Sequence, residues 1–272
     1  MTESAVRTDV LVYEEGTGDS CAQGDVAILL HVPHASAHIP HSVRRHIVLS
    51  DEDLMRERLR LTDWYIDELF ANTFPMVRSP YSRLVFDAER FRSNDDEIMA
   101  AKGMGAIYAK TSDGRPLRSE RLREELLEAF YDPYHTALSA LVGRLLEEHR
   151  QVLLIDAHSF PSEPLPCDIS QEPRRPDICI GTCDVHTPEE LRQISRAYCD
   201  AVGWSVQRNE PYAGTFVPLE YYREETRLHS IMIEVNRSLY MDETAGVRSD
   251  GFASVKEGLY GLLCGLAAFY SI

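Results

Sequence analysis

The sequence predicts an α/β fold in which one mixed, mostly parallel sheet is flanked by helices on both faces. Short apolar runs, such as residues 25–32, are typical of strands that are buried on both sides. These runs alternate with longer segments whose apolar residues recur at helical spacing. Neither an internal repeat nor a linker interrupts the alternation, so we expect a single domain.

The expected elements follow one another in this order. Residues 1–24 mix Gly, Ser, Thr and acidic residues without periodicity, which predicts a flexible leader before a folded domain over residues 25–272. Strands are predicted over residues 25–32, 74–78, 83–86, 152–155, 177–180 and 231–235. Helices are predicted over residues 54–70, 119–149, 188–202 and 252–269, the second of them kinked at Pro133. The looser segment 93–116 is expected to be a long functional loop.

The composition argues against several classes of partner. The 28 Lys and Arg residues face 44 Asp and Glu residues, and the net charge of −16 would repel a nucleic-acid backbone. The start of the chain lacks the pattern of a signal peptide, and the uncharged apolar stretch 258–272 is shorter than a membrane-spanning helix. The six cysteines form no CxxC pair. We therefore expect a cytoplasmic protein without nucleic-acid or membrane partners, and its oligomeric state stays open.

Histidines follow or end two of the predicted strands, where parallel sheets bind their ligands. His34 lies just past the first strand, and we interpret it as a ligand or catalytic group, with a loop-capping role as the alternative. His158 ends another strand run, and Asp156 lies two residues earlier on the same face. Asp156 could orient His158 or share a metal with it, unless the backbone satisfies both. His31 faces away from His34 and is interpreted as a structural, hydrogen-bonded histidine.

Carboxylates and arginines complete the candidate set. Glu234 lies within an apolar strand, where burial disfavours its charged form and suits a general base, although a structural ion pair is possible. Asn236 shares its face. Arg83 and Arg90 flank a strand end and could bind a carboxylate bidentately or pair with nearby acids. Asp63 falls inside a predicted helix, where an aspartate is usually exposed.

Two histidines from different strand ends and one carboxylate form the pattern of a catalytic zinc site with room for water. Zinc would lower the pKa of that water and polarise a carbonyl group, while Glu234 would move the proton. The sequence contains no GxSxG elbow, no phosphate-binding GxxxxGK[ST] loop and no HExxH helix. The residues therefore predict metal-assisted hydrolysis.

Eight blocks of sequence follow one another between residues 27 and 243. They are HVPHAS (31–36), TDWYIDELF (62–70), SRLVFDAER (82–90), MGAIYAKTSDGRPL (104–117), IDAHSF (155–160), PDICIGT (176–182), NEPYAGTFVP (209–218) and IEVNRSLYMDE (233–243). In this order they resemble the N-formylglutamate amidohydrolase family. The resemblance implies a zinc-carboxypeptidase-like (phosphorylase/hydrolase-like) fold over residues 25–272. It also implies hydrolysis of N-formyl-L-glutamate to formate and L-glutamate, a step of histidine degradation.

The resemblance also implies roles for individual side chains. The implied metal ligands, for one Zn²⁺, are His34, Asp63 and His158. The implied groups that bind or line the acidic small-molecule substrate are Arg83, Arg90, Asn236 and Arg237. Glu234 falls at the position of the general base. Asp63 is the least secure ligand, and Asp156 or Glu234 could replace it.

One residue departs from the pattern of the family. Relatives commonly read D-L-N-R where this chain has D-A-E-R, so Glu89 replaces a neutral amide. If Glu89 faced the pocket, its negative charge would weaken the binding of a dicarboxylate, and a different N-acyl or amide substrate would be the alternative. A non-catalytic protein that binds a small acid, and a metal-free hydrolase that uses Ser36 or Ser159, are further alternatives.

Overall fold

Seven strands form one sheet in the computed structural model, which describes residues 10–16, 25–71 and 74–271. The strands are β1 (Val12–Glu14), β2 (Val26–Val32), β3 (Met76–Arg78), β4 (Gln151–Phe160), β5 (Ile178–Gly181), β6 (Val206–Arg208) and β7 (Leu228–Asn236). Their order in the sheet is β1-β3-β2-β4-β7-β5-β6. The β1–β3 and β5–β7 pairs are antiparallel, and the other pairs are parallel. The predicted mixed, mostly parallel sheet is confirmed.

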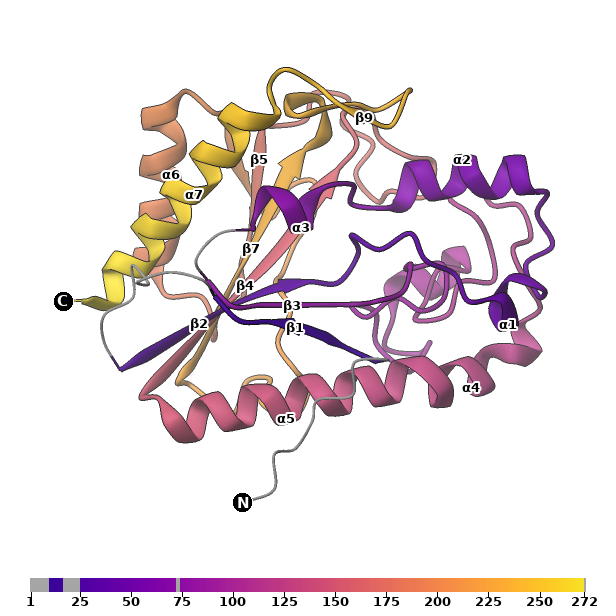
Figure 1. Cartoon of the computed structure of the whole chain (residues 1–272), viewed down its shortest axis with the longest axis horizontal. Helices are drawn as coiled ribbons and strands as arrows, with labels where there is room; N and C mark the ends of the chain where they lie inside the picture. Colours follow the sequence, from indigo (N-terminus) through magenta and orange to yellow (C-terminus); the bar gives the residue numbers. More distant parts are fainter. Residues whose placement is uncertain (1–9, 17–24, 72–73, 272) are drawn as a thin grey trace.

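Helices cover both faces of the sheet (Figure 1). They are α1 (His41–Arg44), α2 (Asp51–Leu61), α3 (Ile66–Leu69), α4 (Arg123–Leu126), α5 (Asp132–Glu148), α6 (Glu189–Val202) and α7 (Phe252–Ala268). Leu138 of α5 packs in one buried cluster with Leu154 of β4. Leu262 of α7 packs in another cluster with Ile155 of β4. Because adjacent strand residues point to opposite faces, β4 contributes to both cores, which explains its continuous apolar run.

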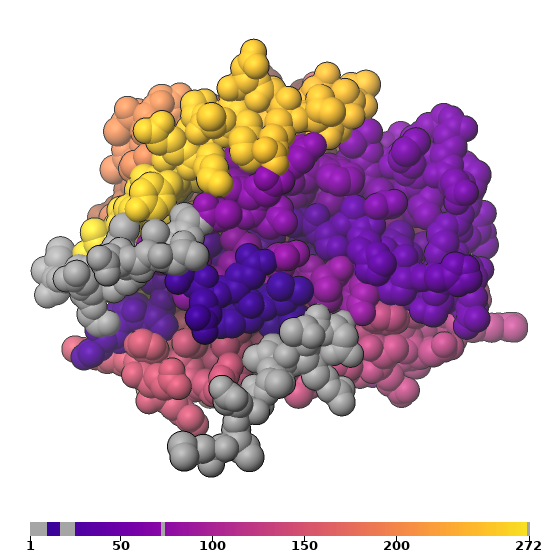
Figure 2. Space-filling model, viewed as in Figure 1, coloured from indigo at the N-terminus to yellow at the C-terminus, as the bar shows by residue number. Residues whose placement is uncertain are grey.

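The space-filling view shows the outer surface of these layers (Figure 2). The C-terminal segment, in yellow, lies along one side of the visible face, and the rose-coloured chain of α4 and α5 lies along the other. A small two-stranded sheet, β8 (Met241–Asp242) and β9 (Val247–Arg248), follows β7. No helix among the described residues is long and apolar enough to cross a membrane.

The helix predicted over residues 54–70 is broken, and the break places Asp63. Helix α2 ends at Leu61, Thr62 is extended, and α3 begins at Ile66. The backbone N–H of Asp63 donates to the carbonyl of His34 at 3.0 Å, which fastens the break to the chain just beyond β2. Asp63 is therefore 2% exposed instead of facing solvent on a helix.

Two further predictions about the first half of the chain were wrong. Residues 83–86 form turns instead of a strand, and the N–H of Val85 donates to the carbonyl of Ser82 at 2.7 Å. The apolar side chains in this segment are buried by the loops and helices around them, so they imitate a strand in sequence. The sheet also begins before residue 25, because β1 pairs with β3 inside the predicted leader. The rest of that leader, residues 1–9 and 17–24, lies outside the described residues.

The long helix predicted over residues 119–149 is composite. A 3₁₀ turn (Glu120–Leu122), α4, a π-helical turn (Leu127–Tyr131) and α5 follow one another, and Pro133 lies in the first turn of α5. Pro133 needs no N–H partner at that position. The strand β6 was not predicted, whereas β4 and β7 are longer than predicted and extend through the polar residues at their ends.

Candidate metal centre

The candidate site lies where the carboxyl ends of three adjacent parallel strands meet. β2, β4 and β7 are neighbours in the sheet, and His158 of β4 lies directly opposite Glu234 of β7. His34 follows the end of β2 by two residues. A cavity of about 670 Å³ opens here and is lined by seven predicted site residues, namely His34, Asp63, Arg83, Arg90, His158, Glu234 and Arg237. We call it the strand-end cavity.

One carboxylate oxygen of Asp63 faces a ring nitrogen of each of two histidines. Oδ2 of Asp63 lies 3.1 Å from Nδ1 of His158 and 3.8 Å from Nδ1 of His34. Nδ1 of His34 is buried and has no hydrogen-bond partner. An unpaired buried nitrogen is costly, and a bound cation would satisfy it. Two imidazole nitrogens and one carboxylate oxygen beside a cavity suit a zinc ion with an open coordination position.

Carboxylates hold the far nitrogens of both histidines. Nε2 of His34 lies 2.8 Å from Oδ1 of Asp87, and Nε2 of His158 lies 3.0 Å from Oδ1 of Asp156. Burial alone would raise the pKa of Asp87, but Arg83 and His34 hold that pKa well below its usual range. In metal sites, such outer carboxylates fix the tautomer of the histidine and leave its other nitrogen free for the metal.

Arg237 fixes the remaining oxygen of Asp63. Its Nη2 donates to Oδ1 of Asp63 at 2.9 Å. Its Nη1 donates to the carbonyl of Arg60 at 2.6 Å, and its Nε donates to Oγ of Ser159 at 3.1 Å. Burial by itself would raise the pKa of Asp63. The hydrogen bond to His158 and the charge of Arg237 outweigh this effect, so the net pKa is lowered and the carboxyl group is ionised. Arg237 lines the cavity, yet each of its nitrogens already donates to the protein.

Glu234 provides an unpaired carboxylate beside these ligand atoms. It is 8% exposed, and its Oε2 is buried without a hydrogen-bond partner. Burial raises the pKa of Glu234 to about 7, as expected from its place in an apolar strand. A carboxylate with this pKa can accept and return a proton near neutrality.

Arg83 and Arg90, the two predicted arginines, differ in the number of hydrogen bonds that they donate to the protein. Nη2 of Arg83 donates to Oδ2 of Asp87 at 2.8 Å, and its Nε donates to the hydroxyl of Tyr108 at 3.1 Å. Nε of Arg90 lies 3.6 Å from the same Oδ2 and has no hydrogen-bond partner. Arg90 therefore offers more donors to a ligand than Arg83 does.

The structure does not bring Asn236 into the strand-end cavity. Its Nδ2 donates to the carbonyl of Pro176 at 3.0 Å, and its Oδ1 accepts from the N–H of Ser238 at 3.1 Å. Asn236 thus caps the short 3₁₀ turn after β7. In an ideal strand it would share a face with Glu234, but the strand ends here and the side chain turns to the backbone.

Glu89, for which the sequence left open whether it faces the pocket, lies close to the histidines. Its Oε1 lies 3.0 Å from Nε2 of His158. Glu89, His34 and His158 form a group whose ligand atoms lie within 4.8 Å of one another, and Glu89, His31 and Asp156 form another. Asp63 is in neither group. The only signal in the sequence was the exchange of an amide for an acid at this position.

Asp63 and Glu89 approach different nitrogens of the two histidines. Oδ2 of Asp63 faces the Nδ1 atoms of both histidines, and the unpartnered nitrogen of His34 is one of them. Glu89 instead approaches the nitrogen of His158 that already meets Asp156. Burial and the nearby Asp156 raise the pKa of Glu89 to about 8, which indicates crowding between two carboxyl groups.

His31 has the structural role expected for it. Its Nδ1 lies 2.9 Å from Oδ1 of Asp156, and its Nε2 lies 2.9 Å from the hydroxyl of Tyr134. His31 is fully buried, and burial lowers its pKa. It therefore supports Asp156, which in turn orients His158.

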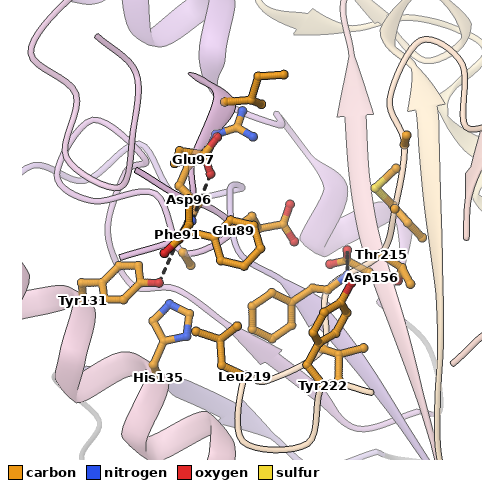
Figure 3. A pocket seen from close by; sticks show the side chains of 18 residues that line it. Glu89, Phe91, Asp96, Glu97, Tyr131, His135, Asp156, Thr215, Leu219 and Tyr222 are labelled. Atoms are coloured by element: carbon orange, nitrogen blue, oxygen red, sulfur yellow. Dashed lines mark hydrogen bonds between the residues drawn. The ribbon is translucent and has the colours of Figure 1, made fainter. Parts of the chain in front are cut away.

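A second cavity of about 350 Å³ adjoins the first (Figure 3). The residues that line both cavities are Glu89, Arg90, Ile98, Ala213 and Met232. We call it the adjoining cavity. Tyr131 and His135 lie on one of its walls, and Asp156 and Thr215 lie across from them in Figure 3.

Known proteins resemble this chain in sequence. The family model described as N-formylglutamate amidohydrolase matches residues 26–241. An N-formylglutamate deformylase of Pseudomonas putida is 31% identical over 238 residues, which cover 82% of this chain and 84% of the relative. A protein of the same name from Pseudomonas aeruginosa (strain PAO1) is 30% identical over 247 residues, which cover 83% and 86%.

Solved structures share the fold. The crystal structure of N-formylglutamate amidohydrolase from Ralstonia eutropha JMP134 superposes with a TM-score of 0.80 at 21% identity, covering 97% of this chain and 99% of that one. The gene product Atu2144 from Agrobacterium tumefaciens superposes with a TM-score of 0.62 at 21% identity, covering 97% of both chains. The family model and the two bacterial relatives carry the assignment, and the chain belongs to the N-formylglutamate amidohydrolase family.

Proposed function

We propose that this chain is a metal-dependent amidohydrolase that releases the acyl group from an N-acyl amino acid. N-formyl-L-glutamate, which would give formate and L-glutamate, is the first substrate candidate because the relatives are named for it. One observation carries the proposal. The ligand atoms of His34, Asp63 and His158 converge beside the unpaired carboxylate of Glu234.

His34, Asp63 and His158 would hold the metal, which we propose to be Zn²⁺. A zinc ion bound there supplies a Lewis acid for the substrate carbonyl and lowers the pKa of a water molecule. The charges of the site favour a dication. The acids are Asp63, Asp87, Glu89, Asp156 and Glu234, and the arginines at the strand-end cavity are Arg83, Arg90 and Arg237. A bound dication would favour the ionised forms of Glu89 and Glu234, whose pKa values are raised by burial. With all five acids ionised, negative charges exceed positive ones by two, and one dication cancels the excess.

Glu234 would act as the general base and then as the general acid. Its free Oε2 accepts a proton from the water that attacks the amide carbon. The oxygen of that water forms the new C–O bond, and the C–N bond breaks. Glu234 returns the proton to the departing amine nitrogen, so the products are a carboxylic acid and a free amino acid.

Arg90 would bind a carboxylate of the substrate. Its Nε is free of hydrogen bonds and it lines the strand-end cavity, whereas Arg83 is bound to Asp87. A guanidinium binds carboxylates bidentately, which would also orient the amide toward Glu234. Arg83 would act through Asp87, which holds His34.

A different N-acyl substrate is the second candidate, because Glu89 places an acid in the cavity that a dicarboxylate would enter. Glu89→Asn restores the amide that relatives commonly carry at this position. If Glu89 excludes the dicarboxylate, this variant should have a higher kcat/KM for N-formyl-L-glutamate than the parent protein. An unchanged or lower value would remove the reason for a second candidate.

Release of formate from N-formyl-L-glutamate, and of the corresponding acid from other N-acyl amino acids, tests the proposal directly. The protein should contain one zinc per chain by elemental analysis, lose activity in a chelator and regain it with Zn²⁺. Activity that is unchanged in a chelator would overturn the metal mechanism. Binding of an N-acyl amino acid without any turnover would instead indicate a non-catalytic binding protein. We also propose a cytoplasmic location, since the described cysteines Cys167, Cys179, Cys183, Cys199 and Cys264 are free thiols.

A further inference from the structure

We propose that the adjoining cavity receives the amino-acid side chain of the substrate and selects an aromatic side chain with an N–H or O–H donor over the carboxylate of glutamate. The proposal rests on the proposed amide hydrolysis at the strand-end cavity. It replaces N-formyl-L-glutamate as the preferred substrate by a class that includes N-formyl-L-tryptophan and N-formyl-L-tyrosine.

The two cavities meet at Arg90, and this sets the orientation of a substrate. Glu89, Arg90, Ala213 and Met232 line both cavities. The α-carboxylate, the amide nitrogen and the side chain of an N-acyl amino acid all branch from one carbon atom. With the α-carboxylate on Arg90 and the amide beside Glu234, the side chain is left to enter the adjoining cavity.

The walls of the adjoining cavity are largely aromatic and aliphatic. They include Phe91, Tyr131, Phe216, Leu219 and Tyr222. Figure 3 shows Phe91, Tyr131, Leu219 and Tyr222 around one space. Its volume of about 350 Å³ is within the range of ~300–1,000 Å³ that is typical of small-molecule pockets. Such walls favour a planar apolar ring over a short charged chain.

The charges around the adjoining cavity oppose a second carboxylate. Among the described residues that line it, the acids are Glu89, Asp96, Glu97 and Asp156, whereas Arg90 is the one arginine or lysine. Arg90 is already engaged if it holds the α-carboxylate. A carboxylate in the side chain would therefore lose its hydration without gaining a cation, which is costly.

A free acceptor marks where a donor of the substrate would bind. Nε2 of His135 is buried and has no hydrogen-bond partner. His135 lies beside Tyr131 and faces the cavity in Figure 3. Burial lowers the pKa of His135 to about 4, so its ring is neutral at pH 7 and has one acceptor nitrogen. With the proton on Nδ1, Nε2 is that acceptor, and it lacks a donor.

Two of the four acids of this cavity, Glu97 and Asp156, already accept hydrogen bonds from the backbone. The carboxylate of Glu97 accepts from the N–H groups of Phe91 and Met99, at 3.0 and 2.9 Å. Oδ2 of Asp156 accepts from the N–H of Phe216 at 2.9 Å. Nε2 of His135 and Oε1 of Glu89 are buried atoms of this lining without a hydrogen-bond partner, and Glu89 lies where the two cavities meet. The indole N–H of tryptophan or the phenol of tyrosine would bind at His135, which lies among the aromatic walls.

Initial rates of formate release by the zinc-loaded protein test the inference. The substrates are the N-formyl derivatives of L-tryptophan, L-tyrosine, L-phenylalanine and L-glutamate. We expect kcat/KM for the tryptophan and tyrosine derivatives to exceed that for the glutamate derivative at least about tenfold, the low end of what pocket contacts supply. A preference for N-formyl-L-glutamate would overturn the inference and leave the proposed function standing. Formate release from none of the four would overturn the inference, and if other N-acyl amino acids release no acid either, the proposed function is overturned as well.

The variant His135→Phe tests the proposed hydrogen bond directly, because it keeps a ring of similar size and removes the acceptor nitrogen. We expect kcat/KM for N-formyl-L-tyrosine to fall about 2- to 10-fold, as for the loss of one hydrogen bond. The value of kcat/KM for N-formyl-L-phenylalanine, which has no such donor, should be unchanged. Equal losses for both substrates would overturn the role of His135. His41→Phe, on an exposed side chain of α1, is the matched control. Thermal-shift titrations with L-tryptophan and L-glutamate should show the same preference without turnover.

Discussion

Oδ2 of Asp63 lies 3.1 Å from Nδ1 of His158, although 95 residues separate the two side chains in sequence. Asp63 comes from the break between α2 and α3, and His158 comes from the carboxyl half of β4. Because Arg237 holds the other oxygen of Asp63, the carboxylate cannot rotate freely away from His158. This arrangement presents a fixed oxygen to any cation that the two histidines bind.

We expect Asp63→Asn to lower the affinity for zinc by at least about tenfold, because an amide is a poorer ligand than a carboxylate. Glu89→Gln should lower it less, since Glu89 approaches the nitrogen of His158 that already meets Asp156. Competition with a chromophoric chelator measures both affinities. A larger loss in Glu89→Gln than in Asp63→Asn would make Glu89 the third ligand.

We expect Glu234→Gln to keep stoichiometric zinc and to lose turnover by a factor of ~10²–10⁴, as for the removal of an acid–base group. The substitution preserves shape and removes the proton acceptor, while the proposed ligands stay in place. Metal content and kcat are measured on the same preparation. A variant with near-normal kcat would rule out Glu234 as the base.

The pH dependence of kcat/KM should report the same carboxylate. Burial raises the pKa of Glu234 to about 7, and a nearby dication lowers it again because it favours the charged form. The base must be deprotonated, so kcat/KM should rise with pH and level off at or below about pH 7. The residual activity of Glu234→Gln should lack this acidic limb, and a limb that persists there would belong to another group.

Residues that are positioned by neighbouring parts of the chain could be predicted from the sequence. His34, His158 and Glu234 could be assigned to strand ends because a strand and its last polar residue are adjacent in the chain, and the structure brings all three to one cavity. Asp63 was placed on a helix, and only the family resemblance suggested its role. Its helix ends because a tertiary hydrogen bond to the carbonyl of His34 replaces the helical one, which no local pattern reveals.

The neighbours of Glu89 and His135 could not be predicted for the same reason. Glu89 lies in a loop, and its distance to His158 depends on how that loop closes over the sheet. His135 falls on the long helix, where the sequence assigned it no role. The π-helical turn before α5 and the loop that contains Phe216 together place it beside a cavity.

The two arginines should separate kinetically. We expect Arg90→Ala to raise KM for an N-formyl amino acid more than it lowers kcat, because the guanidinium of Arg90, whose Nε has no hydrogen-bond partner, would bind the carboxylate of the substrate. Arg83→Ala should act mainly on kcat and zinc affinity, because Arg83 holds Asp87, which holds His34. Steady-state kinetics and zinc titration test both. An unchanged KM in Arg90→Ala would place the carboxylate site elsewhere.

His135 should make the stability of the protein depend on pH. Burial lowers its pKa from 6.5 to about 4, so the unfolded chain binds a proton at pH values where the folded chain does not. Above about pH 6.5, His135 is neutral in both the folded and the unfolded state, and its titration does not affect stability. As the pH falls toward 4, proton binding favours the unfolded state, so the free energy of unfolding decreases. The pKa difference corresponds to at most ~3 kcal/mol. His135→Phe lacks the titrating group. The free energy of unfolding of this variant, minus that of the parent protein, should therefore increase as the pH falls from about 6.5 to about 4. Urea unfolding of both zinc-free proteins between pH 8 and pH 4 measures the difference, in which the other histidines cancel. A difference that stays constant with pH would mean that His135 can be protonated in the folded state, and that its Nε2 is not the neutral acceptor.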